Sequence, residues 1–355
     1  MNVNEKYYVG LDVSSKKTAV CIVDYEGNII HEAMVDTEPL CIDICIKSTG
    51  FAVTKVGIES TNLAIWLCRE LSDLGYTIIC VESHHASAFM SAQKIKTDRN
   101  DARGLAQLMR CKLYKEVHIK SDESQRLKLL LNNRRFLVEQ RVNTENQIRG
   151  SLKTFGLMIG GVTKTHYSRR VRELIDGDGE LEVAVLPLLD HRDSCFEHIT
   201  SLDKLLVRAA KTDPVSRLLM TAPGVGPLTA MLYKAVVDDP TRFKRSRDIA
   251  PHLGLVPQKY ASGEVDYNGS ITRAGDSMLR YHLYKAAESA TRQSARPSPL
   301  KKWARTLEKR SSYKVSRVAV ARKLSIILHR MWMDGTEYDW SRPGEGKKEL
   351  VSMVA

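Results

Sequence analysis

The chain has 355 residues, of which 43% are hydrophobic and 27% charged, the usual composition of a globular protein with room for two or three domains. No apolar run approaches the roughly 18 residues of a membrane span, and the first residues lack the apolar segment of a signal peptide, so we expect a cytosolic protein. The seven cysteines never form a Cys-x-x-Cys pair, and we expect reduced residues, neither a disulfide framework nor a zinc site.

The net charge of +12 is concentrated in one part of the chain. Residues 1–120 carry 14 Lys and Arg against 15 Asp and Glu, whereas residues 214–330 carry 22 against 8. Such an excess is typical of a surface that binds nucleic-acid phosphates, since each neutralised phosphate releases counterions. Charge alone leaves a ribosomal-type role and a membrane-surface role open.

The first 120 residues predict an α/β domain. Short apolar runs of strand character cover residues 7–12, 17–24, 29–35, 53–59 and 76–81. Helical patterns cover residues 38–47, 62–74 and 98–113. The first three strands follow one another through tight connections and predict an antiparallel meander. The whole order is that of a ribonuclease H-like domain.

Four acidic residues lie at the ends of these predicted elements. Asp12 ends the first strand and Glu59 ends the fourth, while Asp98 and Asp101 lie three apart in the first turn of a helix, within the stretch Lys94–Arg103. In a sheet of this kind the first and fourth strands are neighbours, and we expect the four carboxylates to converge. Four such groups suit a hard divalent cation, Mg²⁺ or Mn²⁺, and two such ions ~4 Å apart can cut a phosphodiester.

Each acid also has a structural interpretation. Asp98 and Asp101 complement the dipole at a helix N-terminus without any chemistry. Asp12 suits a turn at the end of a strand, and Glu59 suits a helix cap before Ser60-Thr61-Asn62.

Residues 121–212 predict a coiled-coil helical hairpin that serves as a spacer. The apolar positions of its first arm are Leu127, Leu131, Val138, Val142, Ile148, Leu152 and Phe155. The glycine-rich residues 156–180 are expected to form the tip or a loosely ordered loop. Residues 182–211 would be the returning arm, which Pro187 must break or start.

A basic, mainly helical module is expected over residues 213–335, with a tail over residues 336–355. Its Pro223-Gly-Val-Gly226 turn lies between two helical runs and resembles a helix-hairpin-helix, in which Gly224 and Gly226 let the backbone approach a phosphate. The alternative is a plain helix–helix turn. The basic residues expected to bind nucleic acid are Arg242, Lys244, Arg245, Arg247, Lys259, Arg273 and Arg280.

Ser262 lies in a predicted polar loop before Gly263, where a hydroxyl can face solvent. A serine hydroxyl is a weak nucleophile unless a base or a metal activates it, and no histidine occupies an obvious partner position. The chain alone therefore favours a turn serine, and Ser270 and Ser277 compete with it for any catalytic role.

In their order along the chain, these motifs resemble the DEDD transposases of the insertion-sequence family one hundred and ten, which are related to Piv-type DNA invertases. The motifs are Gly10-Leu-Asp12-Val-Ser, Gly57-Ile-Glu59-Ser, Lys96-Thr-Asp98-Arg-Asn-Asp101-Ala, Pro223-Gly-Val-Gly226, Gly254-Leu-Val-Pro257, Ser262-Gly263, Gly269-x-Ile-Thr-x-x-Gly275-Asp276 and Leu279-Arg280. The resemblance covers residues 7–332. Val256 and Arg273 stand where threonine and lysine are common in the family, and both changes are conservative.

The resemblance implies a DNA transposase and site-specific recombinase. Asp12, Glu59, Asp98 and Asp101 of a RuvC-like domain would hold Mg²⁺ or Mn²⁺, and Ser262 of a transposase domain would attack a DNA phosphate to give a phosphoserine intermediate. Donor and target DNA and a structured bridge RNA that guides the enzyme would be its partners. The working form would be a homodimer or a tetramer in the prokaryotic cytoplasm, at the nucleoid when active.

Two other functions remain open at this point. A metal-dependent endonuclease of the RuvC resolvase type would use water as its nucleophile and leave Ser262 a structural role. A non-catalytic nucleic-acid-binding protein would keep the basic module and lose the chemistry of the acids.

Overall fold

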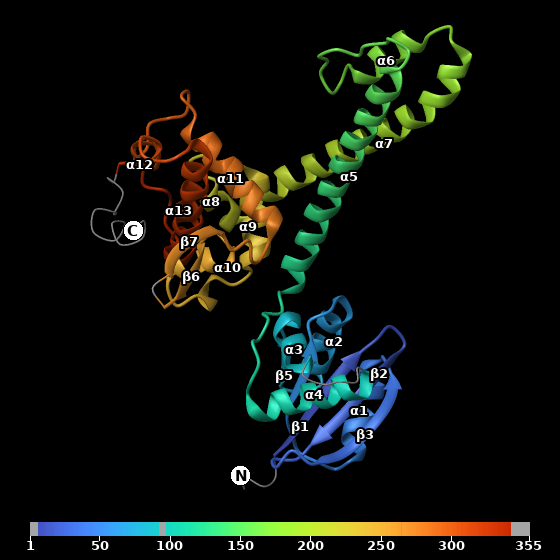
Figure 1. Cartoon of the computed structure of the whole chain (residues 1–355), viewed down its shortest axis with the longest axis vertical. Coiled ribbons are helices and arrows are strands. Elements are labelled where there is room, and N and C mark those ends of the chain that lie inside the picture. The colour runs from blue at the N-terminus through green and yellow to red at the C-terminus, as the bar shows by residue number, and fades with distance from the viewer. Residues whose placement is uncertain (1–5, 92–96, 264, 342–355) are drawn as a thin grey trace. The chain divides into compact units, whose positions relative to one another are not determined.

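The computed structural model describes residues 6–91, 97–263 and 265–341, and the chain divides into two compact units, residues 1–120 and 121–355 (Figure 1). The first unit is mixed α/β and the second is mainly helical, as the sequence predicts. Residues 94–96 of the acidic motif and the tail beyond Ser341 lie outside the described residues. Within the described ranges, no helix combines the length and the apolar character that crossing a membrane requires.

The first unit is built on a five-stranded sheet in the order β3-β2-β1-β4-β5. Its strands are β1 Tyr7–Val13, β2 Lys17–Val23, β3 Ile29–Asp36, β4 Val53–Glu59 and β5 Ile78–Val81. The pairs β1–β2 and β2–β3 are antiparallel, whereas β1–β4 and β4–β5 are parallel. The predicted meander and the predicted pairing of the first strand with the fourth are therefore both present.

Helices cover both faces of this sheet. They are α1 Pro39–Ser48, α2 Asn62–Asp73, α3 Ser83–Met90 and α4 Asp98–Cys111. Because successive side chains of a strand point to opposite faces, the sheet carries two cores. Val9 and Leu11 pack with α1 and α2 on one face, while Tyr8 and Cys21 pack with α3 and α4 on the other.

The second unit begins with two long helices, α5 Asp122–Lys153 and α7 Gly179–Thr212, which run side by side (Figure 1). Arg134 of α5 hydrogen-bonds Asp203 of α7 at 3.1 Å, and Glu145, further along α5, accepts a hydrogen bond from Arg192 at 3.0 Å. Since the later residue of α5 contacts the earlier residue of α7, the two helices are antiparallel.

The apolar pattern expected along α5 is wrong in the middle and at the end. Val142 and Phe155 are exposed, whereas Arg141 is buried beside Glu145. Arg192 of α7 is also buried and donates to the same carboxylate. Where α5 and α7 meet at Glu145, the contact is therefore a cluster of charged side chains. Buried charges are tolerated where they are paired and hydrogen-bonded, which a hydrophobic repeat does not anticipate.

The glycine-rich segment connects α5 to α7 and so forms the tip of the helix pair, one of the two arrangements expected for it. It is not a loosely ordered loop, because it contains a helix, α6 Tyr167–Ile175, whose Tyr167, Val171 and Ile175 are buried at a spacing of four. The expectation for Pro187 is wrong. Pro187 neither breaks nor starts the second long helix, because α7 continues through it. A proline removes the hydrogen bond to the carbonyl four residues earlier, and Val183 at that position is 79% exposed, so water can serve that carbonyl instead.

The rest of the second unit is a helical module with one β-hairpin. Its elements are α8 Pro214–Leu219, α9 Pro227–Val237, the 3-10 turns η2 Pro240–Arg242 and η3 Ser246–Asp248, α10 Ile249–His252, β6 Pro257–Ser262, β7 Val265–Ile271, α11 Ser277–Thr291, α12 Pro299–Glu308 and α13 Tyr313–Asp334. Leu127 of α5 and Leu206 of α7 share one core with these helices. The base of the long helix pair is thus continuous with the helical module.

Candidate functional site

Asp12 and Glu59 occupy neighbouring positions at the ends of two parallel strands. Leu11 and Ile58 are paired in the β1–β4 ladder, and the two acids come next along each strand. Adjacent strands lie about 4.8 Å apart, so the two side chains start close together. Both are half-buried, and they point to the face of the sheet that Gly10 and α4 share.

Helix α4 presses its backbone against that face. A Cβ added to Gly10 would lie 2.1 Å from the carbonyl oxygen of Ala102 and 2.4 Å from the amide nitrogen of Ala106. Asp98 and Asp101 lie in the first turn of α4, just before Ala102, and Asp98 is exposed while Asp101 is half-buried. The helix that carries these two acids therefore covers the face that carries Asp12 and Glu59.

A bidentate ion pair fixes α4 on the sheet. Arg103 donates from Nε and Nη2 to the two carboxylate oxygens of Glu32 on β3, at 2.6 Å and 2.7 Å. These hydrogen bonds hold the pKa of Glu32 below its ordinary value. No local sequence pattern predicts this pair, because Arg103 and Glu32 lie far apart along the chain and meet only when α4 packs on the sheet.

The four acids meet part of what a metal site requires. Their carboxylates are the donors that Mg²⁺ and Mn²⁺ prefer. Asp12 and Glu59 lie side by side, and the other two acids begin the helix on the same face. Among the residues that the structure describes, however, no three Asp, Glu, His or Cys side chains lie close enough together to hold a metal ion. The donor chemistry fits such an ion, while the side chains as placed do not enclose one.

Ser262 is the last residue of strand β6, which corrects the expected polar loop. Strands β6 and β7 form a two-stranded hairpin in which Ser262 pairs with Val265 across the turn. Every residue of β6 is exposed, and so is β7 up to Ser270. At ~3.4 Å per residue, Ser262 lies about 17 Å along the strand from Pro257 at its root. The sequence failed here because an unpacked hairpin lacks the apolar alternation by which strands are recognised.

Two glycines hold the root of this hairpin. Gly254, at φ +65°, lies so close to the facing loop that an added Cβ would meet the amide nitrogen and carbonyl oxygen of Ala274 at 2.3 Å each. Gly275, at φ +68°, approaches the carbonyl of His252 in the same way, at 2.2 Å. The amide of Thr272 also donates to the carbonyl of Val256 at 2.9 Å. Close packing at the root of the hairpin therefore explains these two motif glycines, and a role near the Ser262 hydroxyl at its tip does not.

The Pro-Gly-Val-Gly turn joins α8 to α9. Gly224 is exposed, has φ +77°, and would place a Cβ 2.1 Å from the carbonyl oxygen of Ala286 in α11. Gly226 caps α9 and has open space around it. Packing against α11 therefore accounts for Gly224, and only Gly226 offers an unobstructed approach to the helix N-terminus.

The predicted nucleic-acid-binding side chains fall into three groups. Lys244, Arg247 and Arg273 are exposed. Arg245 pairs with Asp248 at 3.0 Å, and Lys259 pairs with Asp266 at 3.2 Å. Two others are held internally, as each donates to backbone carbonyls: Arg242 to Val237 at 3.1 Å, and Arg280 to Leu253 at 3.2 Å. Burial lowers the pKa of both of these guanidinium groups.

Comparison with known proteins places both units in one family. The DEDD transposase model of the IS110 family matches residues 9–156, and the model described as "Transposase IS116/IS110/IS902 family" matches residues 216–303. The Coxiella burnetii transposase for insertion sequence element IS1111A is 26% identical over 329 residues, covering 90% of this chain and 88% of its own.

Two further relatives agree. The Yersinia enterocolitica transposase for insertion sequence element IS1328 is 26% identical over 285 residues, covering 80% of this chain and 85% of its own. A Sinorhizobium fredii protein, y4pF/y4sB, whose name also places it among transposases, is 29% identical over 304 residues, covering 83% of this chain and 76% of its own.

These matches define the class of protein: the chain is a DNA transposase, an enzyme that moves an insertion sequence. Within that class, it belongs to the IS110 family of DEDD transposases.

Proposed function

We propose that this transposase exchanges DNA strands through a covalent phosphoserine intermediate formed by Ser262, under the guidance of a structured RNA. The first unit acts in this proposal as a RuvC-like domain of the ribonuclease H fold. Its three-stranded antiparallel meander, followed by two parallel strands, supports that assignment. The antiparallel α5–α7 pair acts as the coiled-coil spacer, and residues 213–335 form the transposase domain.

The observation that carries the proposal is the place of Ser262 at the end of an exposed, firmly rooted ribbon. A two-stranded β-ribbon is narrow enough to enter the major groove of DNA. A two-stranded hairpin by itself is only marginally stable in water. Contact with a DNA strand would stabilise it. Ser262 next to Gly263, at φ +57°, can then meet a phosphate with little steric hindrance.

The reaction is a transesterification in which atoms and charge balance. The Ser262 hydroxyl loses its proton as Oγ bonds to the scissile phosphorus, and the phosphorus–O3′ bond breaks to leave a 3′-hydroxyl. An incoming 3′-hydroxyl reverses the step on the new strand and restores the serine. Since the phosphodiester energy is kept in the phosphoserine bond, resealing needs no nucleotide cofactor.

Asp12, Glu59, Asp98 and Asp101 would hold the Mg²⁺ or Mn²⁺ of this reaction. Such an ion supplies positive charge that stabilises the phosphate and the leaving oxygen. Asp12 and Glu59 are side by side, so the proposal requires Asp98 and Asp101 to complete the set when cation and DNA bind.

Lys244, Arg247, Arg273 and the amides at Gly226 would bind DNA or RNA backbones, which positions the strands without specifying a sequence. Donor and target would be chosen by base pairing with the guide RNA, as in other guided systems. The resemblance to the family and the basic composition of residues 214–330 support this part of the proposal.

The central test is an adduct assay with Ser262→Ala. Purified protein, guide RNA and end-labelled DNA are incubated with Mg²⁺ and separated under denaturing conditions. The wild type should give a protein–DNA adduct and recombinant product, and Ser262→Ala should give neither. Ser270→Ala, in the same hairpin, is the matched control and should retain both. If Ser262→Ala still releases free DNA ends, water is the nucleophile and the endonuclease interpretation is correct.

A metal-dependence test addresses the acids. Asp98→Asn should abolish adduct formation while the chain keeps its circular dichroism spectrum, because the residue is exposed at a helix start. Full activity in excess EDTA would exclude a metal role for the four carboxylates.

A complementation test addresses assembly. We propose that the acids of one protomer act with Ser262 of another in a dimer or a tetramer. Mixing Ser262→Ala with Asp12→Ala should then restore recombination, although each variant alone is inactive. Absence of rescue at every mixing ratio would show that each protomer works with its own acids.

A further inference from the structure

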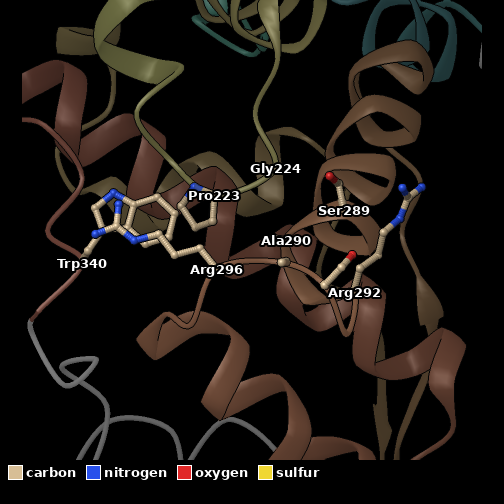
Figure 2. A pocket seen from close by; sticks show the side chains of 9 residues that line it. Pro223, Gly224, Ser289, Ala290, Arg292, Arg296 and Trp340 are labelled. Carbon is tan, nitrogen blue, oxygen red and sulfur yellow. The ribbon is translucent and has the colours of Figure 1, made fainter.

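A cavity of about 240 Å³ lies in the second unit, away from every residue assigned above except Gly224 (Figure 2). Three segments form it: the turn at Pro223, the end of α11 with the loop that follows it, and the segment after α13. Its polar and aromatic lining comprises Ser289, Arg292, Ser294, Arg296 and Trp340. Trp340 lies beyond α13, in a segment that matches no sequence motif.

Buried hydrogen bonds hold these segments in place. The Lys301 ammonium group, whose residue is only 5% exposed, donates to the carbonyls of Gln293 and Ala295 at 3.0 Å and 2.5 Å. These bonds fix the loop between the two arginines. The amide of Tyr338 donates to Thr221 Oγ1 at 3.0 Å and ties the last segment to the turn. The cavity is therefore preformed, which lowers the entropic cost of binding.

The side chains around the cavity are of the kinds that contact bases and phosphates in nucleic-acid-binding proteins. The Arg296 guanidinium carbon lies 4.4 Å from the centroid of the Trp340 ring, and Figure 2 shows the two planes stacked. Both arginines are exposed. The nearby Asp339 carboxylate already accepts hydrogen bonds from the amide and hydroxyl of Ser341. Guanidinium and indole planes stack on bases, and guanidinium groups bind phosphate.

We propose that this cavity binds a single unpaired nucleotide of a DNA or RNA strand. Its base would stack on the Arg296–Trp340 pair. Pockets for drug-sized ligands typically span ~300–1,000 Å³, so this smaller cavity suits one nucleotide and cannot admit a duplex. In a duplex, moreover, both faces of each base are already stacked. The proposal deepens the proposed function, because it rests on the chain's action on nucleic acid, and it assigns a site for strand ends or unpaired bases during exchange.

The test measures binding of fluorescein-labelled oligothymidylate, oligouridylate and a mixed-sequence DNA duplex to the full chain by fluorescence anisotropy. Trp340→Ala should weaken single-strand binding at least about fivefold, the lower end of what one lost base–aromatic stack costs. Trp340→Phe should retain most of the affinity. Arg296→Lys, which keeps the charge and loses the planar group, should also weaken single-strand binding. The comparison of the two single strands identifies DNA or RNA as the source of the nucleotide.

Two controls separate this site from general electrostatics. Arg305→Ala removes one exposed positive charge from α12, outside the cavity, and should weaken duplex and single-strand binding to the same small extent. Trp66→Ala removes an exposed tryptophan from the first unit and should change neither.

Wild-type single-strand affinity in both Trp340→Ala and Arg296→Lys would overturn the proposal. Equal loss for duplex and single strand in these variants would overturn it as well. The adduct assay reports on the serine mechanism and the anisotropy assay reports on this cavity, so a failure of either one is distinguishable from a failure of the other.

Discussion

Substituting Gly10 tests whether the seating of α4 on β1 determines both the stability of the first unit and the placement of Asp98 and Asp101. A Cβ at Gly10 would lie 2.1 Å from the carbonyl oxygen of Ala102, where ordinary contact begins at 3.4 Å. The obstructing atoms belong to the α4 backbone, so no rotamer change can relieve the clash. The helix must move outward by about 1 Å, and Gly10→Ala should destabilise the first unit.

The expected cost follows from overpacking a close-packed core. Such insertions typically cost ~1–3 kcal/mol, and the upper part of that range applies here because a whole helix must shift. A loss of about 2 kcal/mol corresponds to a roughly 30-fold rise in the unfolded fraction. The recombination rate should fall by more than the loss of folded protein explains, because the displaced turn carries Asp98 and Asp101 away from Asp12.

Gly57→Ala is the matched control. Gly57 pairs with Gly10 in the same ladder, but the three atoms nearest to its added Cβ all belong to the Met109 side chain, at 2.7 Å to 2.9 Å. A flexible methionine can move aside, so this variant should lose clearly less stability. Native-state hydrogen exchange of the β1 and β4 amides in the full chain measures the local free energy of opening. If Gly10→Ala is no less stable than Gly57→Ala, the inferred seating of α4 is wrong.

Three further predictions concern the second unit. Pro187→Ala should raise the free energy of unfolding by up to ~3 kcal/mol in urea denaturation, because it restores the hydrogen bond to the Val183 carbonyl within α7. Burial opposes ionisation of Asp213, but hydrogen bonds led by that from Lys234 outweigh it and hold the Asp213 pKa below its ordinary value. That stabilisation is complete above the unfolded-state pKa of about 3.9 and is lost as the pH falls through the lower folded-state pKa, so Asp213→Asn should flatten the fall in melting temperature between about pH 4 and pH 2. Arg192→Ala should cost ~1.5–3 kcal/mol in urea denaturation, because it removes a buried guanidinium that donates to Glu145 and leaves that carboxylate to Arg141.

Each of these results has a contradicting outcome. A Pro187→Ala variant less stable than the wild type would mean that α7 needs a bend at this residue. If the melting temperature of Asp213→Asn fell between pH 4 and pH 2 as steeply as that of the wild type, ionised Asp213 would not stabilise the folded state. For Arg192→Ala the comparison is Arg169→Ala on α6, which is exposed and should cost under ~1 kcal/mol; equal losses would refute the assignment of a buried ion cluster.

The sequence determined the features that depend on local pattern. The strands ending in Asp12 and Glu59, the helix beginning at Asp98, and the helices flanking Gly224 all follow from apolar periodicity and capping residues. Those signals lie within a few residues of the element they specify. The order of the elements then predicts that the first and fourth strands are neighbours.

Only the tertiary structure decided the features that depend on distant segments. Arg192 meets Glu145 only because α5 and α7 pack together, and α7 continues through Pro187 because that packing outweighs one lost hydrogen bond. The hairpin that carries Ser262 has no apolar face, so the sequence does not reveal its strands. The root at Gly254 takes its shape from the loop after β7. A single chain can encode periodicity locally, but the contacts that bury a charge or fix an exposed ribbon exist only after the chain has folded.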